Sequence, residues 1–210
     1  LVALSTNKPG VKPMLINGKP LKSVNQLYNK RKAKYQSVLS GQKKTSRKIE
    51  ALTYHRNRFV ENYLHNTSKL VVEYLTTNNI GTVVIGKNDN WKQGANIGKK
   101  NNQNFTQIPH YKLIQQITYK CQLVGIKVIE TEESYTSKTS AIDLEKPICH
   151  ENYVGKRVKR GLFLSATGKV INADINGSLQ IIRKKFPEVF TAEGIVSCAV
   201  QPVLVNPISR

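Results

Sequence analysis

Short apolar runs recur along the chain, each bounded by polar or turn-forming residues. Runs of three to five residues rich in Leu, Val and Ile are the length of buried strands. They lie at 1–5, 14–16, 82–85 and 126–129. Turn signals separate the first two runs and follow the second, as Lys8-Pro9-Gly10 and Asn17-Gly18. We therefore predict an antiparallel hairpin and, later in the chain, two further strands.

Segments with apolar residues at every third or fourth position separate these runs, and this spacing predicts helices. The helices are expected at 22–39, 45–77, 109–124 and from 174 to about 185. We further predict an irregular insert at 138–160, a small hairpin at 162–170 and a strand-like region at 196–205. Strands that alternate with helices indicate an α/β domain with a mixed sheet and helices on both faces. A hairpin followed by strand–helix units is typical of an RNase H-like fold.

The charge of the chain is strongly positive and unevenly distributed. Lys and Arg total 33 against 13 acids, which gives a net charge of +20. Residues 1–60 hold 14 basic residues and one acid, so this part carries +13. Such a charge repels itself unless a polyanion neutralises it, so nucleic acid is the first candidate partner and an anionic membrane the second. The sequence shows no apolar run near the length of a bilayer span and no signal peptide, which argues against a membrane protein.

The predicted helices at 22–39 and 45–77 form a basic helical hairpin. Acids are almost absent from its first half, so ion pairs within a helix cannot neutralise the lysines. A solvated charged face is the alternative, but we expect a nucleic-acid-binding surface. Its candidate residues are Lys30, Arg31, Lys34, Lys43, Lys44, Arg47, Lys48 and Arg56. A second basic segment, which follows the insert, adds the candidates Lys156, Arg157, Lys159 and Arg160.

Two acidic positions could hold a metal ion. Asp174 stands where the last predicted helix begins, and Glu132 and Glu133 follow the strand at 126–129. Carboxylate oxygens are the ligands that Mg²⁺ prefers. Asp174 could instead cap its helix, since Asp is a preferred N-cap residue, and Glu133 could be a solvated strand end. The residues alone leave both alternatives open.

The three cysteines, Cys121, Cys149 and Cys198, are far apart and form no C-x-x-C pair. A zinc ribbon therefore cannot be assembled from cysteines alone, and we expect no structural zinc. An odd number of widely spaced cysteines suits reduced thiols in a cytosolic or nuclear setting.

Four segments resemble the nuclease half of TnpB-type transposon proteins, which are RNA-guided DNA nucleases related to type V CRISPR effectors and Fanzors. Leu1–Thr6 is similar to the strand after the family's first catalytic Asp, and Thr82–Lys87 to the strand that usually ends at its catalytic Glu. Glu132–Ser140 resembles the family's Tyr-Thr-Ser segment, and Asn172–Gly177 its third catalytic motif. The resemblance covers nearly the whole chain and implies a RuvC-like nuclease domain.

Three departures from the family pattern change what the resemblance implies. The first catalytic Asp is expected upstream of Leu1, so the chain is expected to be a fragment of a longer protein. The usual Glu position falls at Gly86 or Lys87. Some family members carry a relocated Glu, and that position is Glu133 here, with Glu132 as the fallback. The zinc ribbon is degenerate.

The resemblance implies that Glu133 and Asp174 bind two Mg²⁺ ions with which the protein hydrolyses phosphodiester bonds, with guide RNA and target DNA as partners. It also implies a cytoplasmic protein, in the bacterial cytosol or nucleoid. Residues 1–185 would form the RuvC-like domain and 186–210 a C-terminal tail. The domain would contain the basic helical hairpin at 22–77 and the degenerate zinc-ribbon insert at 138–170. Two alternatives remain: an RNA-guided DNA-binding protein without nuclease activity, and a basic RNA-binding domain.

Overall fold

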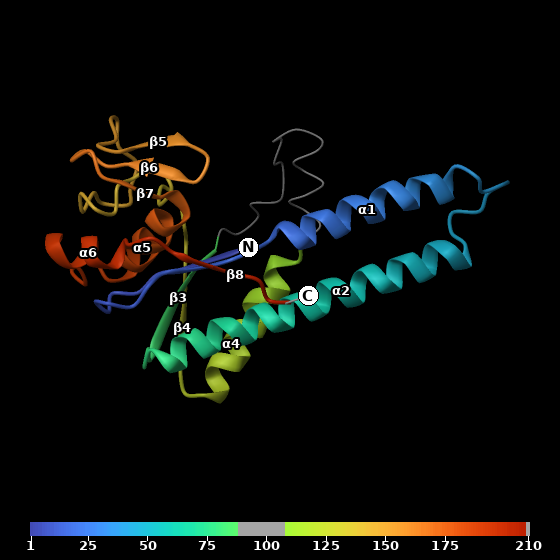
Figure 1. Ribbon diagram of the computed structural model, residues 1–210, viewed down its shortest axis with the longest axis horizontal. Coiled ribbons are helices and arrows are strands. Elements are labelled where there is room, and N and C mark those ends of the chain that lie inside the picture. Colours follow the sequence, from blue (N-terminus) through green and yellow to red (C-terminus); the bar gives the residue numbers. More distant parts are fainter. Residues whose placement is uncertain (88–107, 209–210) are drawn as a thin grey trace.

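The computed structural model describes residues 1–87 and 108–208. This part of the chain contains both helices and strands (Figure 1). They are β1 (Val2–Leu4), β2 (Met14–Ile16), α1 (Lys19–Gln36), α2 (Arg47–Thr77), β3 (Thr82–Gly86), α4 (His110–Leu123), β4 (Lys127–Thr131), β5 (Lys156–Lys159), β6 (Leu162–Leu164), β7 (Val170–Asn172), α5 (Ala173–Lys185), α6 (Ala192–Cys198) and β8 (Val203–Val205). No helix in the described residues is long and apolar enough to span a bilayer.

The described strands form three small sheets, with the orders β1-β2-β8, β3-β4 and β5-β6-β7. The predicted hairpin is confirmed, since β1 pairs antiparallel with β2. The late strand β8 pairs parallel with β2, and β3 pairs parallel with β4. A mixed α/β fold is therefore present, but the single mixed sheet that we expected is replaced by separate sheets in this part of the chain.

The basic helical hairpin is formed by α1 and α2, which run side by side away from the sheets (Figure 1). Ser46 begins α2 as its N-cap, and its side chain accepts from the Ile49 N–H. Arg56 joins the two helices by donating from Nε to Asn25 Oδ1 at 2.8 Å. The Arg56 guanidinium also lies over the Tyr28 ring, so this arginine stabilises the hairpin from within.

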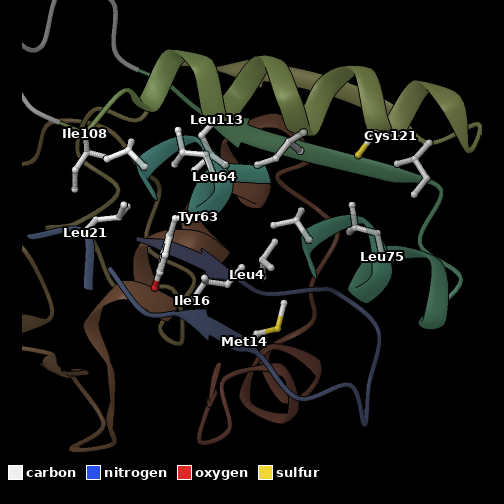
Figure 2. Packing of buried hydrophobic residues seen from close by; sticks show 14 residues of the cluster. Leu4, Met14, Ile16, Leu21, Tyr63, Leu64, Leu75, Ile108, Leu113 and Cys121 are labelled. Atoms are coloured by element: carbon white, nitrogen blue, oxygen red, sulfur yellow. The ribbon is translucent and has the colours of Figure 1, made fainter. Parts of the chain in front are cut away.

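Two neighbouring clusters of buried side chains form most of the core. The larger cluster packs α2 and α4 on the β1–β2 hairpin, with Leu64 and Tyr63 at its centre (Figure 2). The Tyr63 hydroxyl donates to the Asn17 carbonyl at 2.5 Å and so ties α2 to the end of β2. The second cluster lies between α5 and α6 and includes Ile175 and Ile195.

Two sequence-based predictions of local structure are wrong. Residues 156–159, expected within an irregular insert, form β5, because they pair with β6 in register with Leu162 and Leu164. The region at 196–205, predicted to be strand-like, contains the last residues of α6, and only Val203–Val205 is a strand.

Two features stabilise α6. The Thr191 side chain caps the helix by accepting from the Gly194 N–H, and Ile195 and Cys198 are buried on one face. The residues after 185, expected as a tail, thus contribute to the core and to a sheet.

Candidate active site

Asp174 lies in the first turn of α5, directly after β7. Asn172 is the N-cap of this helix, because its Oδ1 accepts from the Asp174 N–H at 2.9 Å and the Ile175 N–H at 3.2 Å. The alternative that Asp174 caps the helix is therefore wrong. The Asp174 side chain is 62% exposed and its Oδ1 lies 3.9 Å from an Arg157 guanidinium nitrogen. The positive end of the helix dipole attracts a negatively charged side chain in this first turn.

Glu133 follows the end of β4 by two residues and lies over Gly86, the last residue of β3. A Cβ atom added at Gly86 would stand 3.1 Å from Glu133 Oε2 and 2.5 Å from Ile181 Cδ1. The Glu133 carboxylate thus occupies the space next to the position where the resemblance placed the usual Glu. The missing side chain of Gly86 allows this close approach.

The pKa of Glu133 is raised, first because burial disfavours its charged form and second because the Glu132 carboxylate is nearby. A divalent cation at this carboxylate would offset both effects. The direction of the pKa shift thus fits a carboxylate whose charge is best accommodated when a cation is bound.

Glu133 and Asp174 line the same cleft, which has a volume of about 1350 Å³. Residues of β1 and β3 line this cleft, together with Gly177, Ser178 and Ile181 of α5. The two carboxylates that the sequence singled out are thus brought to one space by different elements. Within residues 1–87 and 108–208 no cluster of three or more His, Cys, Asp or Glu side chains could hold a metal ion.

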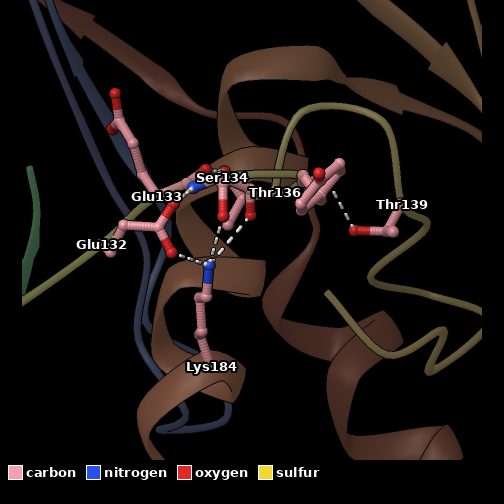
Figure 3. A network of polar contacts seen from close by, with 7 residues as sticks. Glu132, Glu133, Ser134, Thr136, Thr139 and Lys184 are labelled. Atoms are coloured by element: carbon pink, nitrogen blue, oxygen red, sulfur yellow. Dashed lines mark hydrogen bonds and ion pairs between the residues drawn. The ribbon is translucent and has the colours of Figure 1, made fainter. Parts of the chain in front are cut away.

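Glu132, the fallback candidate, turns to Lys184 of α5 and does not line the cleft (Figure 3). Its Oε2 accepts from Lys184 Nζ at 2.7 Å. The hydrogen bond from Lys184, assisted by Ser134, lowers the pKa of Glu132 to about 2. Glu130, the third acid of this segment, pairs with Lys87 at 3.1 Å.

Polar residues on the buried face of α5 hold the segment that follows Glu133. Asn176 accepts from the Ala141 N–H at 2.9 Å and donates to the Thr139 carbonyl at 2.8 Å. Gln180 and Arg183 donate to the Glu145 carbonyl. Sequence reasoning missed this network, although polar residues at positions 176, 180 and 183 follow helical spacing and could have indicated it.

Carboxylates hold the insert at 138–170, which the resemblance predicted to be a degenerate zinc ribbon. Glu145 accepts from the Ser140 and Val154 N–H groups at 2.7 and 3.1 Å. Asp143 accepts from the Ser140 hydroxyl and the Ala166 N–H. These bonds join distant parts of the insert without using Cys149, whose side chain is exposed.

The candidate nucleic-acid-binding residues lie on two surfaces. On the hairpin and the turn between its helices, Lys30, Arg31, Lys34, Lys43, Lys44, Arg47 and Lys48 are exposed, whereas Arg56 is partly buried. On the β5 side, Lys156, Arg157, Lys159 and Arg160 are exposed, and Arg157 and Arg160 also line the cleft. The second group therefore places positive charge beside Asp174.

Comparisons with known proteins match both halves of the chain. Residues 1–92 match the family of probable transposases OrfB_IS605, and residues 110–181 match the Cas12f1-like TNB domain. The CRISPR-associated endodeoxyribonuclease Cas12f1 of Sulfoacidibacillus thermotolerans is 30% identical over 142 residues, covering 67% of this chain and 31% of that protein. The TnpB-like protein ORF457 of Acidianus two-tailed virus is 27% identical over 152 residues, covering 71% of this chain and 29% of that protein.

Among solved structures, a cryo-EM structure of a Cas12f1–sgRNA–target DNA complex is similar in fold. Its TM-score is 0.55 at 17% identity, and the match covers 87% of this chain and 49% of that chain. The chain spans about a third of the length of the two curated relatives.

Replacing the helix cap should destabilise α5 more than replacing the candidate metal ligand. We expect Asn172→Ala to lower the free energy of unfolding by about 1 kcal/mol, since it removes two N-cap hydrogen bonds, and Asn172→Asp to retain most of the stability. Asp174→Ala should cost less, because Asp174 contributes through the helix dipole. Urea unfolding followed by circular dichroism measures all three. A larger loss for Asp174→Ala than for Asn172→Ala would contradict this assignment of the cap.

The ion pair of Glu132 predicts a pH-dependent contribution to stability. A carboxyl group whose pKa is lowered on folding stabilises the protein above its ordinary pKa near 4.5, and this contribution is lost as the pH falls through about 2. Glu132→Gln should therefore be less stable than the unsubstituted chain at pH 7, and the difference should shrink below pH 4.5. Thermal unfolding at pH 7, 4 and 2.5 measures the effect. A difference that is the same at all three pH values would contradict it.

Proposed function

We propose that this chain, which is related to TnpB-type proteins and to Cas12f1 over most of its length, is the nuclease part of a transposon's RNA-guided DNA endonuclease. One observation carries the proposal: Glu133, over Gly86, and Asp174, at the start of α5, line a single cleft beside Arg157. Such an enzyme would act in the cytoplasm, where guide RNA and DNA are both accessible.

The residues present fit divalent metal ions. Glu133 and Asp174 offer hard carboxylate oxygens, which Mg²⁺ prefers, and burial of Glu133 disfavours its charge without a cation. Two Mg²⁺ ions about 4 Å apart, when bound, would activate water and stabilise the attacking and leaving oxygens of a phosphodiester. Glu133 and Asp174 would bind and orient these ions. A third carboxylate, expected from the upstream Asp, would complete the ligands.

The basic residues would hold the nucleic acids through phosphate groups. Arg157 and Arg160 are cations that line the cleft, so they are placed to orient a phosphate near the carboxylates. The exposed lysines and arginines of the hairpin would contact a guide RNA–target DNA duplex through its backbone, which carries no sequence information. Sequence would be read by base pairing with the guide.

The proposed RNase H-like arrangement needs one more strand, which we propose lies in the cleft between β1 and β3. Each of β1 and β3 has one neighbouring strand in the described part of the chain, β2 and β4 respectively. Both strands also line the cleft. A strand placed between them would pair with both edges and join β1-β2-β8 and β3-β4 into one mixed sheet. A carboxylate at the end of such a strand would lie near Glu133 and Asp174.

A second candidate function is RNA-guided DNA binding without cleavage. It is favoured by one observation: the described residues bring two carboxylates to the cleft and no cluster of three or more metal-binding side chains. The basic surfaces serve either function equally well, so only cleavage separates the two.

The direct test is cleavage of a guided DNA target in Mg²⁺ by the purified protein with its guide RNA, expressed with any residues that its gene encodes before Leu1. We expect cutting, and a loss of more than about 100-fold for Glu133→Ala and for Asp174→Ala, since loss of a metal ligand should exceed the 10–100-fold cost of losing its supporting residues. Binding of the guided target should be unchanged in both variants.

Glu151→Ala is the matched control, since Glu151 is exposed and does not line the cleft, and it should cut normally. Guided binding without cutting, unaffected by either substitution, would support the second candidate. Failure of the protein to bind guide RNA at all would overturn both.

The additional strand can be tested by hydrogen exchange. In the chain of residues 1–210 we expect fast exchange at those backbone amides of β3 that do not bond to β4, because the cleft exposes them to water. The same amides should be protected in a protein that carries the preceding residues. Equal exchange in both proteins, measured by NMR or mass spectrometry, would contradict the RNase H-like arrangement.

A further inference from the structure

Lys184 of α5 makes three hydrogen bonds to the segment that contains Glu133. An ammonium group has three N–H donors, and each has a partner: Glu132 Oε2 at 2.7 Å, Ser134 Oγ at 2.9 Å and the Ser134 carbonyl at 3.0 Å (Figure 3). The Lys184 side chain is 19% exposed, so its contacts are partly shielded from water. All three contacts lie on the residues that flank Glu133.

These bonds fix the backbone on both sides of Glu133. The Ser134 N–H donates to Glu132 Oε1 at 3.0 Å, which closes a turn around the Lys184 ammonium. The Glu133 carbonyl accepts from the Thr136 hydroxyl at 2.8 Å. Because neighbouring side chains leave an extended backbone on opposite sides, holding Glu132 toward Lys184 directs Glu133 away from it, as Figure 3 shows.

A simple surface ion pair does not account for this arrangement. Glu132 is 59% exposed, so water screens its attraction to Lys184 and reduces, without removing, the contribution of this charge pair to stability. Two of the three bonds go to Ser134, which carries no charge, and one of them to its backbone carbonyl. The contacts therefore determine the geometry of the turn more than they neutralise charge.

We propose that Lys184 is a positioning residue for Glu133: by holding Glu132 and Ser134, it determines which of two adjacent carboxylates faces the cleft. Lys184 itself does not line the cleft. The inference rests on the proposed function in that Glu133 is taken as a metal ligand. The inference also makes a purely structural claim, which is that Lys184 sets the orientation of Glu133. This orientation can be measured without any metal.

The orientation of Glu133 can be read by NMR on the chain without metal. Glu133 Oε2 and Ile181 Cδ1 both approach the same point above Gly86, so a nuclear Overhauser effect is expected between the Ile181 δ-methyl and Glu133 side-chain protons. We expect this signal in the unsubstituted chain and its loss in Lys184→Met, which keeps the length of the side chain but removes the three donors. Lys184→Arg should retain it, because guanidinium can still donate to Glu132 and Ser134.

Lys185→Met is the matched control, since Lys185 is the exposed neighbour on the same helix, and it should keep the signal. Persistence of the signal in Lys184→Met would overturn the proposal. If Lys184→Met fails to fold, Glu132→Ala takes its place, because it removes one of the three partners and should weaken the same signal. An unchanged signal in Glu132→Ala would then overturn the proposal.

The consequence for metal binding is measured by Mg²⁺ titration and by guided cleavage. In Lys184→Met the Mg²⁺ concentration at half-maximal cleavage should rise about 10-fold or more, as for other residues that orient a metal ligand, with a smaller effect at saturating Mg²⁺. Lys184→Arg should restore the unsubstituted value. A loss of the Ile181–Glu133 signal with an unchanged Mg²⁺ requirement would overturn the positioning role. If the unsubstituted protein neither binds Mg²⁺ nor cuts, the proposed function fails, while the Overhauser signal still decides the orientation.

Discussion

Close packing above Gly86 is the constraint on which the candidate site depends. Three elements meet there: β3 contributes a residue without a side chain, α5 contributes Ile181, and the segment after β4 contributes Glu133. A larger residue at position 86 would have to displace one of the other two, because its Cβ would stand 2.5 Å from Ile181 Cδ1. The Glu133 carboxylate thus lies next to the space that a side chain at position 86 would need. The same packing holds α5, and with it Asp174, at the cleft.

The acidic residues around the cleft differ in what surrounds them, and this difference separates their roles. Glu130 and Glu132 are exposed and paired with Lys87 and Lys184. Asp174 is exposed, with Arg157 at 3.9 Å. Glu133 is the partly buried acid of this group, and its pKa moves in the opposite direction to that of Glu132. Two neighbouring residues of identical chemistry are thus given opposite environments by one turn and one lysine.

The sequence predicted the regular elements well, because their spacing is set by local burial. The helices α2 and α4 and the strands β3 and β4 begin and end within a few residues of the predicted limits. The errors arise where tertiary contacts decide. Nothing in the sequence around 196–205 shows that Ile195 and Cys198 are buried together on a helix, and no local pattern shows that the strands form separate sheets. Glu132 pairs with Lys184, which lies 52 positions away along the chain. The sequence alone therefore could not show that Glu132, and not Glu133, contacts this lysine.

The central claim is that Glu133 and Asp174 share bound divalent cations, and X-ray diffraction from crystals soaked in Mn²⁺ tests it most directly. Mn²⁺ accepts the same oxygen ligands as Mg²⁺ and gives an anomalous signal that locates each ion. The account predicts anomalous peaks in the cleft, with Glu133 and Asp174 both within about 2.0–2.3 Å of an ion of the same site. Peaks elsewhere on the protein, or ions bound by Glu132 while Glu133 points away from them, would contradict it.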